Sequence, residues 1–205
     1  MRTAVTCALV LLLGLAAFSE VSAGFRVVTS EAARRLAVRE HVPQIPDAML
    51  AGASAYSLRD DLARDGRIAL VDFIYTRCES VCSVLGTEFQ QLQQELEKQG
   101  LQDRVRLISI SFDPADDANA LSRYASRVHA NALVWRFASV ADPQALRPLL
   151  DAFGIVVVPD GMGGFVHNAA IHTLAPDGRL TRIDDVGGAR IALRSALARA
   201  AVASR

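Results

Sequence analysis

Two cysteines, Cys78 and Cys82, lie four residues apart in the stretch VDFIYTRCESVCSVLG, residues 71–86. A thiolate is both the nucleophile of disulfide exchange and a ligand of soft metals, and it forms more readily beside a cation or at a helix N-terminus. Arg77 precedes Cys78, and a helix-like pattern follows the pair. The pair is therefore a candidate redox disulfide, a candidate soft-metal site or a structural staple.

The spacing of the two cysteines permits redox and metal chemistry. Helical side chains four residues apart have Cβ atoms about 5 to 6 Å apart, whereas a disulfide requires roughly 3.5 to 4.5 Å. Closing the bridge would distort the turn, and a strained bridge is more easily reduced. Two thiolates slightly farther apart suit one shared metal ion. Stabilisation is a weak reason for the bridge, because so short a loop contributes only about 1 to 2 kcal/mol.

Length and composition narrow the class of protein. The chain has 205 residues, of which 51% are hydrophobic, so it can bury one sizeable core. Its 22 basic and 22 acidic residues give a formal net charge of zero, so the composition shows no excess of positive charge that would indicate nucleic-acid binding. Besides Cys7 near the start, the chain has only Cys78 and Cys82, too few for the disulfide framework of a small secreted domain.

The N-terminus has the pattern of a secretory signal. Arg2 precedes an apolar run from Ala4 to Phe18, and Val21-Ser22-Ala23 resembles a small-residue cleavage site. The run has about fifteen residues, whereas crossing a bilayer takes roughly 20. We therefore expect residues 1–23 to be a signal peptide that is cleaved on export. Cys7 lies too early in the run for lipoprotein acylation and leaves with the signal.

The rest of the chain reads as a short leader followed by an α/β domain. Residues 24–52 show no sustained periodicity, and we interpret them as an extended N-terminal segment before a domain at residues 53–205. In that domain, IALVDFIY (68–75) is typical of a strand buried on both faces. Helical spacing then continues to Gly100. The further predicted elements are a strand at 104–112, a helix from Asp116-Asp117 to about His129, a strand at 133–140, a helix from Asp142-Pro143 to Phe153-Gly154, strands at 166–174 and 179–184, and a helix at 188–203.

This order predicts a thioredoxin-like fold, that is, a central mixed β-sheet flanked by helices, with a βαβ half followed by a β-hairpin and a closing helix. Reactive groups in open α/β sheets gather where the C-terminal end of a strand meets the start of a helix. Cys78 follows the first core strand by three residues. The predicted fold thus places the cysteine pair at a reactive edge.

Two thiolates leave a copper or zinc site incomplete, and histidine is the natural completing ligand. The chain has four histidines, at positions 41, 129, 167 and 172. We expect His41 to be solvated and His129 to stabilise a helix end. His167 follows the loop Gly161-Met162-Gly163-Gly164 and opens a strand, from where it could face the cysteine helix. His172, five residues later, is expected on the opposite strand face. The residues alone make His167 one candidate for a third ligand and leave its role open.

Three separated segments, FIYTRCESVCSVLG, LISISFDPADDANALSRYA and FGIVVVPDG...VHNAAIHTLAPDGRL, resemble in their order the Sco/SenC family. These are thioredoxin-like copper proteins that help to assemble the copper centre of cytochrome c oxidase. The similarity runs from about Tyr56 to the C-terminus. It implies that Cys78, Cys82 and His167 bind one copper ion, Cu(I) or Cu(II). It also implies that the same cysteines pass between dithiol and disulfide.

The resemblance further implies a place and a set of partners. We expect a periplasmic protein that is soluble after signal cleavage, or tethered to the inner membrane if the N-terminal segment is uncleaved. The expected partner is the copper-bearing subunit of cytochrome c oxidase, with other periplasmic copper chaperones or thiol reductants as further candidates and no nucleic acid. The family's loop usually carries a proline after each cysteine and an acidic residue before the histidine. This chain has Glu79, Ser83 and Val166 there, and we expect a less rigid loop.

Two functions follow from these residues. The first is a copper chaperone for oxidase assembly, a carrier rather than a turnover enzyme, with a two-cysteine, one-histidine site. The second is a thiol:disulfide oxidoreductase that uses Cys78 and Cys82 without delivering copper. Asp113, in the SFDP segment, could orient the site or serve as a loop or cap residue, and it is left outside the ligand set.

Overall fold

The computed structural model describes residues 2–22, 24, 27, 29–52, 55–78 and 81–203, without the side chains of residues 81–83, 202 and 203. The chain divides into two compact units, Met1–His41 and Val42–Arg205. The first unit contains helices α1 (Arg2–Val21) and α2 (Ser30–His41). The second contains all the strands found in the described residues.

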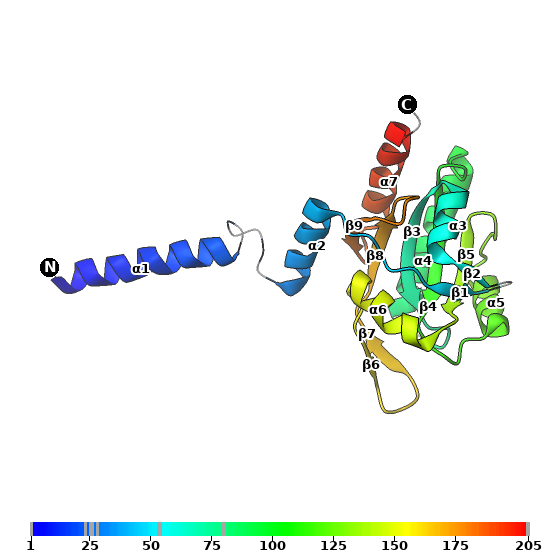
Figure 1. The fold of residues 1–205 in the computed structure, drawn as a ribbon, viewed down its shortest axis with the longest axis horizontal. Helices are drawn as coiled ribbons and strands as arrows, with labels where there is room; N and C mark the ends of the chain where they lie inside the picture. The colour runs from blue at the N-terminus through cyan, green and yellow to red at the C-terminus, as the bar shows by residue number, and fades with distance from the viewer. Residues whose placement is uncertain are drawn as a thin grey trace. The chain divides into compact units, whose positions relative to one another are not determined.

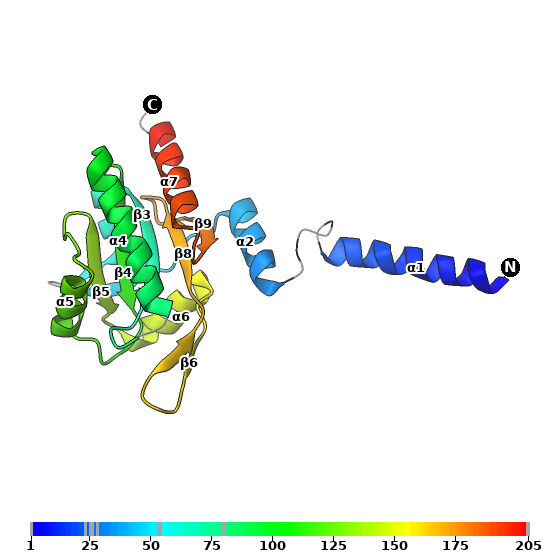
Figure 2. The same cartoon turned by 180° about the vertical axis from the view of Figure 1, so that it is seen from behind.

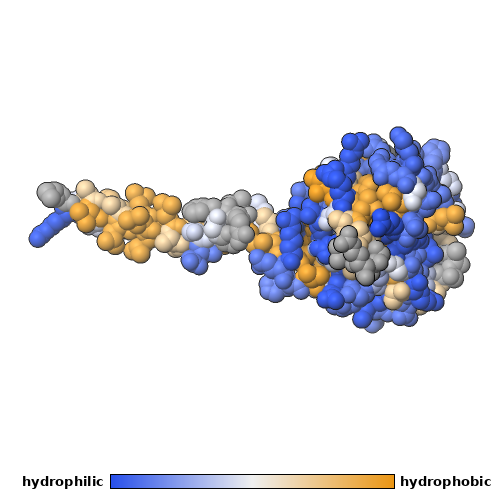
Figure 3. Space-filling model, turned by 90° about the horizontal axis from the view of Figure 1, so that it is seen from above, coloured by the Kyte–Doolittle hydropathy of each residue, from blue (hydrophilic) through white to orange (hydrophobic). Residues whose placement is uncertain are grey.

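Helix α1 has 20 residues, none of them buried, and apolar side chains cover much of the side that Figure 3 shows. Among the described residues it is the one helix long and apolar enough to cross a membrane, a test that a signal sequence near an N-terminus also passes. The signal-peptide boundary predicted at residue 23 stays a prediction, since Ala23 lies outside the described residues.

The expectation that residues 24–52 are extended is wrong for α2. This helix begins where the Thr29 hydroxyl accepts a hydrogen bond from the N–H of Ala32 at 3.1 Å. Glu31 then pairs with Arg34 and Arg35, each at 3.0 Å. Pairs at i+3 and i+4 stabilise a helix without any apolar periodicity, so a search for an apolar stripe does not detect this helix.

The second unit is built on a seven-stranded mixed sheet in the order β2-β1-β5-β4-β3-β8-β9. Strands β3, β4 and β5 are parallel, and β8 and β9 continue the sheet antiparallel. The strands are β1 (Met49–Ala51), β2 (Ala55–Ser57), β3 (Ile68–Ile74), β4 (Val105–Ser111), β5 (Trp135–Val140), β8 (Ala170–Leu174) and β9 (Leu180–Asp185). The helices are α3 (Leu58–Asp65), α4 (Val81–Gln99), α5 (Ala118–Arg127), α6 (Pro143–Phe153) and α7 (Ala189–Ala203).

Helices cover both faces of this sheet. Helices α4 and α7 lie on one face, and α3 and α6 lie on the other, as the two opposite views show (Figures 1 and 2). Every residue of β3 and β4 is buried, which explains why both strands read as nearly continuous apolar runs. The predicted thioredoxin-like arrangement is therefore confirmed. Sequence reasoning missed the short elements α2, α3, β1, β2 and β6 (Val157–Pro159), and it predicted one strand at 166–174 where the structure has two.

The strand expected over residues 166–174 is two strands. Strand β7 (Phe165–His167) pairs with β6 (Val157–Pro159) in a separate two-stranded sheet, whereas β8 joins the central sheet. Asn168 separates them. Its side-chain oxygen accepts a hydrogen bond from the N–H of Val156 at 2.7 Å, and its side-chain nitrogen donates to the carbonyl of Gly154 at 2.9 Å. His167 thus lies on a hairpin outside the central sheet.

Candidate functional site

Cys78 lies in the short connection between β3 and α4. Its backbone N–H donates to the carbonyl of Tyr75 at 3.2 Å, and its side chain is only 6% exposed. Helix α4 begins at Val81, three residues later. The thiol therefore stands between the C-terminal end of a parallel strand and a helix N-terminus, where the partial positive charge of the helix favours a thiolate.

Asp116 holds the connection that carries Cys78 through hydrogen bonds to Thr76. This buried carboxylate accepts hydrogen bonds from the N–H of Thr76 at 2.7 Å, the hydroxyl of Thr76 at 2.6 Å and the hydroxyl of Ser111 at 2.6 Å. Asp117 alone caps α5, accepting from the N–H of Ala120 at 2.7 Å. The expected Asp116-Asp117 cap is thus divided into two roles, and the first one orders the cysteine loop.

Asp113 makes a second link to this loop. Its carboxylate forms an ion pair with Arg77 at 2.8 Å, and it is buried while the arginine side chain is 56% exposed. The hydrogen bond to Asp113 is the main reason why the pKa of Arg77 is raised. Asp113 therefore orients the residue that precedes Cys78.

The contacts of His167 indicate which of its two ring nitrogens carries the proton. Its Nδ1 lies 2.9 Å from the carbonyl oxygen of Asn168. A carbonyl only accepts, so the ring proton resides on Nδ1 and the lone pair on Nε2, the nitrogen that can ligate a metal. Burial lowers the pKa of His167 below its usual value of 6.5, although the hydrogen bond to Asn168 opposes that shift. This shift favours the neutral imidazole, the form in which a histidine ligates a metal.

Tyr75 brings the cysteine loop and the histidine hairpin together. Its carbonyl accepts from the N–H of Cys78, its hydroxyl donates to the carbonyl of Phe165 at 3.2 Å, and its ring centroid lies 6.0 Å from that of His167. The ring of Phe112 packs against both, with its centroid 5.5 Å from that of Tyr75 and 4.9 Å from that of His167. Two segments 90 residues apart thus share one aromatic cluster.

Asn168 fixes the orientation of the His167 ring through its backbone carbonyl. Because its side chain is bound to the backbone of Val156 and Gly154, its own carbonyl is held in place to accept from His167. Groups that bind the second nitrogen of a metal-ligating histidine set its tautomer and ring orientation. Sequence reasoning missed this residue, although its place directly after His167 in VHN was visible.

The predictions that concern the other half of the cysteine loop stay predictions. Glu79 and the side chains of Cys82 and Ser83 lie outside the described residues. Among the residues that are described, no three His, Cys, Asp or Glu side chains gather into a metal cluster. The described part of the site therefore consists of Cys78, His167 and the residues that hold them.

The other three histidines lie elsewhere. His172 is fully buried in β8, with Nε2 at 3.0 Å from the carbonyl of Phe153 and its ring edge-on to that of Phe73. His129 follows α5 with a positive φ of 52°, and its carbonyl accepts from the side chain of Gln93 at 3.0 Å. His41 ends α2, its Nδ1 3.2 Å from the carbonyl of Ala37. Each has a local structural contact of its own, and the choice of His167 as the ligand stays a prediction.

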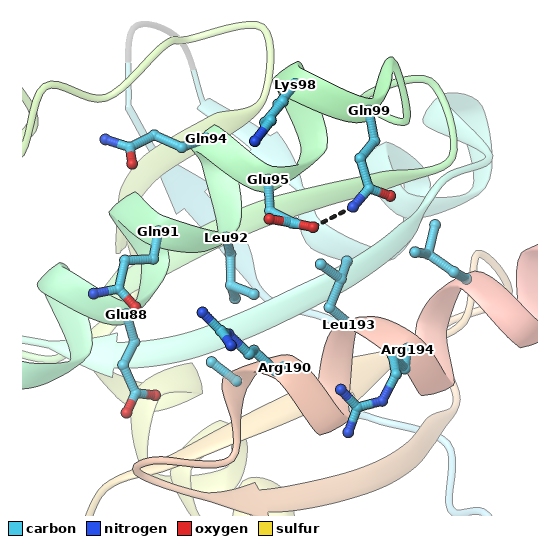
Figure 4. A pocket seen from close by; sticks show the side chains of 12 residues that line it. Glu88, Gln91, Leu92, Gln94, Glu95, Lys98, Gln99, Arg190, Leu193 and Arg194 are labelled. Atoms are coloured by element: carbon cyan, nitrogen blue, oxygen red, sulfur yellow. Dashed lines mark hydrogen bonds between the residues drawn. The ribbon is translucent and has the colours of Figure 1, made fainter.

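A hollow of about 680 Å³ lies between α4 and α7, away from this site. Figure 4 shows its apolar floor, which includes Leu92 and Leu193, and charged side chains such as Glu95, Arg190 and Arg194 around it. The hollow that contains Cys78 is smaller, about 360 Å³. The candidate chemistry therefore does not coincide with the larger cavity.

Comparisons with known proteins concern the family and the fold. The sequence model of the SCO1/SenC family matches residues 57–201. A SCO1 protein homolog from Bacillus subtilis (strain 168) is 28% identical over 120 residues, which cover 57% of this chain and 61% of the relative. The match thus spans about three fifths of that relative.

Two solved structures share the fold. One is BsSco, described as a member of the Sco family of cytochrome c oxidase assembly proteins and reported with a disulfide switch, with a TM-score of 0.59, 21% identity, and coverage of 73% of this chain and 92% of that one. The other is ScoI of Bradyrhizobium japonicum with copper bound, with a TM-score of 0.59, 22% identity, and coverage of 74% and 99%. Since the family's sequence model matches well over half of the chain, this protein belongs to the SCO1/SenC family.

Proposed function

We propose that this chain is an exported copper-binding protein that delivers copper during assembly of the copper centre of cytochrome c oxidase. Family membership supports this role, as do the copper bound to a structural neighbour and the oxidase-assembly family to which another is assigned. The observation that carries the proposal is that the ring of His167, whose Nδ1 faces the carbonyl of Asn168, packs on Tyr75, and the carbonyl of Tyr75 also accepts a hydrogen bond from the N–H of Cys78.

The proposed ligands are Cys78, Cys82 and His167, with one copper ion as cargo. Two thiolates and one imidazole form a soft donor set that suits Cu(I) and also accepts Cu(II). The chain's other residues prepare these donors. Asp116 orders the loop of Cys78, the nearby start of α4 favours loss of its thiol proton, and Asn168 keeps the proton of His167 on Nδ1.

The proposed partner is the copper-bearing subunit of cytochrome c oxidase, with periplasmic copper chaperones or thiol reductants acting before it. The proposed location is the periplasm. Helix α1 would act as the export signal or, if retained, as a membrane tether, because its length and composition suit both.

A second candidate function is thiol:disulfide exchange by the same cysteines. The position of Cys78 at a strand end and before a helix favours it. In that reaction the Cys78 thiolate attacks a partner disulfide and releases one partner thiolate. Cys82 then attacks the mixed disulfide and releases the second, so two electrons pass to the partner and the chain is left with a disulfide.

Copper titration tests the first proposal. The reduced protein is titrated with Cu(I) and with Cu(II), together with Cys78→Ser, Cys82→Ser and His167→Ala, and with His41→Ala as a control histidine that is exposed and lies in the first unit. We expect one copper ion per wild-type chain and a loss of affinity or an altered spectrum in the first three variants alone. Absence of stoichiometric copper in the wild type would refute the carrier role.

The same variants separate the two functions. If copper binds but His167→Ala changes neither affinity nor spectrum, then the third ligand is another group. For the exchange reaction, the rate at which the reduced protein reduces a disulfide-bonded peptide is measured. Exchange is expected to need Cys78 and Cys82 but not His167, and no exchange in the wild type would remove the second function.

A further inference from the structure

Two adjoining hollows next to Cys78 form one groove with a basic lining. The inner hollow, about 360 Å³, contains Cys78 and is also lined by Thr87, Gln90 and Tyr124. The outer one, about 660 Å³, runs along α5 past Ala120, Ser122, Arg123 and Ser126. Both are lined by Thr76, Arg77 and Arg127. We call the two hollows together the arginine groove.

The arginine groove carries a surplus of positive charge. Three arginines line it, at positions 77, 123 and 127, and among the described lining residues there is no carboxylate. Arg77 is neutralised by Asp113, whereas neither Arg123 nor Arg127 forms an ion pair within the described part of the chain. The formal charge of the whole chain is zero, so the surplus is a local property of this surface.

Arg127 is held in position before any ligand arrives. Its guanidinium donates to the carbonyl of Thr76 at 2.8 Å, and its central carbon lies 5.1 Å from the centroid of the Tyr124 ring. A stacked, hydrogen-bonded guanidinium loses less side-chain freedom when it binds an anion. Arg123 lies one turn earlier on α5 and is exposed, so the two cations follow each other along one helix face.

The length of the groove indicates the size of its occupant. From Ala120 to Arg127 the helix rises about 10 Å, which is the span of about three residues of extended chain. A small thiol compound would fill only the inner hollow beside Cys78. An extended peptide would fill both hollows and contact the cations of both.

We propose that the arginine groove docks an extended, acidic segment of a cysteine-bearing protein partner. Carboxylates of that segment lie against Arg123 and Arg127, and its cysteine lies beside Cys78. The inference deepens the proposed function, on which it rests, because it states which kind of partner segment could exchange copper or a disulfide with this thiol. Charge complementarity along the groove favours acidic partner segments over neutral or basic ones.

The test measures binding apart from thiol chemistry. Labelled peptides carry serine in place of cysteine, flanked either by two acidic residues on each side or by the matching amides Asn and Gln, and binding to the full chain is followed by fluorescence anisotropy. At an ionic strength of about 25 mM we expect the acidic peptide to bind at least about fivefold more tightly, with the difference disappearing near about 0.5 M salt.

Variants locate the binding. Arg123→Gln and Arg127→Gln are each expected to weaken the acidic peptide about two- to fivefold. Arg199→Gln makes the same charge change on α7, outside the groove, and is expected to leave binding unchanged. Arg127→Lys retains the charge and should preserve most of the affinity. Arg123 forms no hydrogen bond to the cysteine loop within the described residues, so its variant tests the groove without disturbing that loop.

Several results would overturn the inference. These are equal binding of the acidic and amide peptides, an equal loss in Arg199→Gln, competition by citrate as effective as that by the peptide, or tighter binding of single-stranded DNA of the same charge. Copper titration of Arg123→Gln is run in parallel and is expected to match the wild type. If the wild type binds no copper, the proposed function fails while the peptide result still decides the role of the groove.

Discussion

Replacing Asp72 by asparagine is expected to stabilise the folded protein above pH 7 and to change it little near pH 4. Asp72 lies in the middle of β3 with no exposed surface, paired in register with Ser109 of β4. Neither carboxylate oxygen makes a well-formed hydrogen bond to a described residue, and the Ser109 hydroxyl also accepts from the indole nitrogen of Trp135 at 2.9 Å. Burial therefore dominates and raises the pKa of Asp72 to about 7, while the nearby Ser109 hydroxyl opposes the shift only in part.

The size and sign of the effect follow from that pKa. The carboxyl has a pKa of 3.8 when it is not perturbed and about 7 in the folded protein. Between these values the folded state binds more protons than the unfolded state, so stability falls as pH rises, by about 1.4 kcal/mol per pH unit. The gap of about three pH units corresponds to a destabilisation of about 4 kcal/mol, which is complete above pH 7 and absent below about pH 4.

Denaturant unfolding of wild type and Asp72→Asn between pH 4 and pH 8 measures this difference. Subtracting the two curves removes the other titrating groups, which the variants share. We expect the variant to gain about 4 kcal/mol at pH 8 and less than about 1 kcal/mol at pH 4. Asp103→Asn serves as a control because Asp103 is exposed. Parallel curves for wild type and Asp72→Asn would refute the argument that a buried carboxyl is ionised at a cost.

Three further predictions concern the residues around the site. Asp116→Asn should destabilise the fold by about 2 to 4 kcal/mol in denaturant unfolding, because it weakens three hydrogen bonds to a buried carboxylate; a change below about 0.5 kcal/mol would contradict its role. Asn168→Ala should weaken copper binding by about 10- to 100-fold in a competition titration while Cys78 is unchanged, since the carbonyl that faces His167 is no longer held by the side-chain bonds to Val156 and Gly154; an unaltered affinity would separate Asn168 from the site. In the metal-free protein, NMR should show His167 titrating below its usual pKa of 6.5, so that it stays neutral to a lower pH, and a midpoint above 6.5 would be inconsistent with its burial.

The sequence by itself determined the framework of the reactive edge. The apolar run at 68–75, the helical spacing up to Gly100 and the alternation of strands and helices are local patterns, and burial of those side chains stabilises the elements that they predict. They place Cys78 between β3 and α4 without knowledge of any distant contact. Asp72 was read within that apolar run as part of a buried strand, but its ionisation could not be foreseen from its neighbours in sequence.

Tertiary structure decided which distant residues support Cys78. The side chain of Asn168 forms hydrogen bonds with the backbone of Gly154 and Val156, and the predicted strand is interrupted at this residue. His167 therefore lies outside the central sheet. Likewise, Asp116 and Asp117 are both plausible caps in sequence, and only the position of Thr76 beside the end of β4 makes the first a support for the cysteine loop. Local propensity follows from neighbouring residues, whereas a buried carboxylate or a histidine tautomer is set by partners that only the folded chain brings within hydrogen-bond distance.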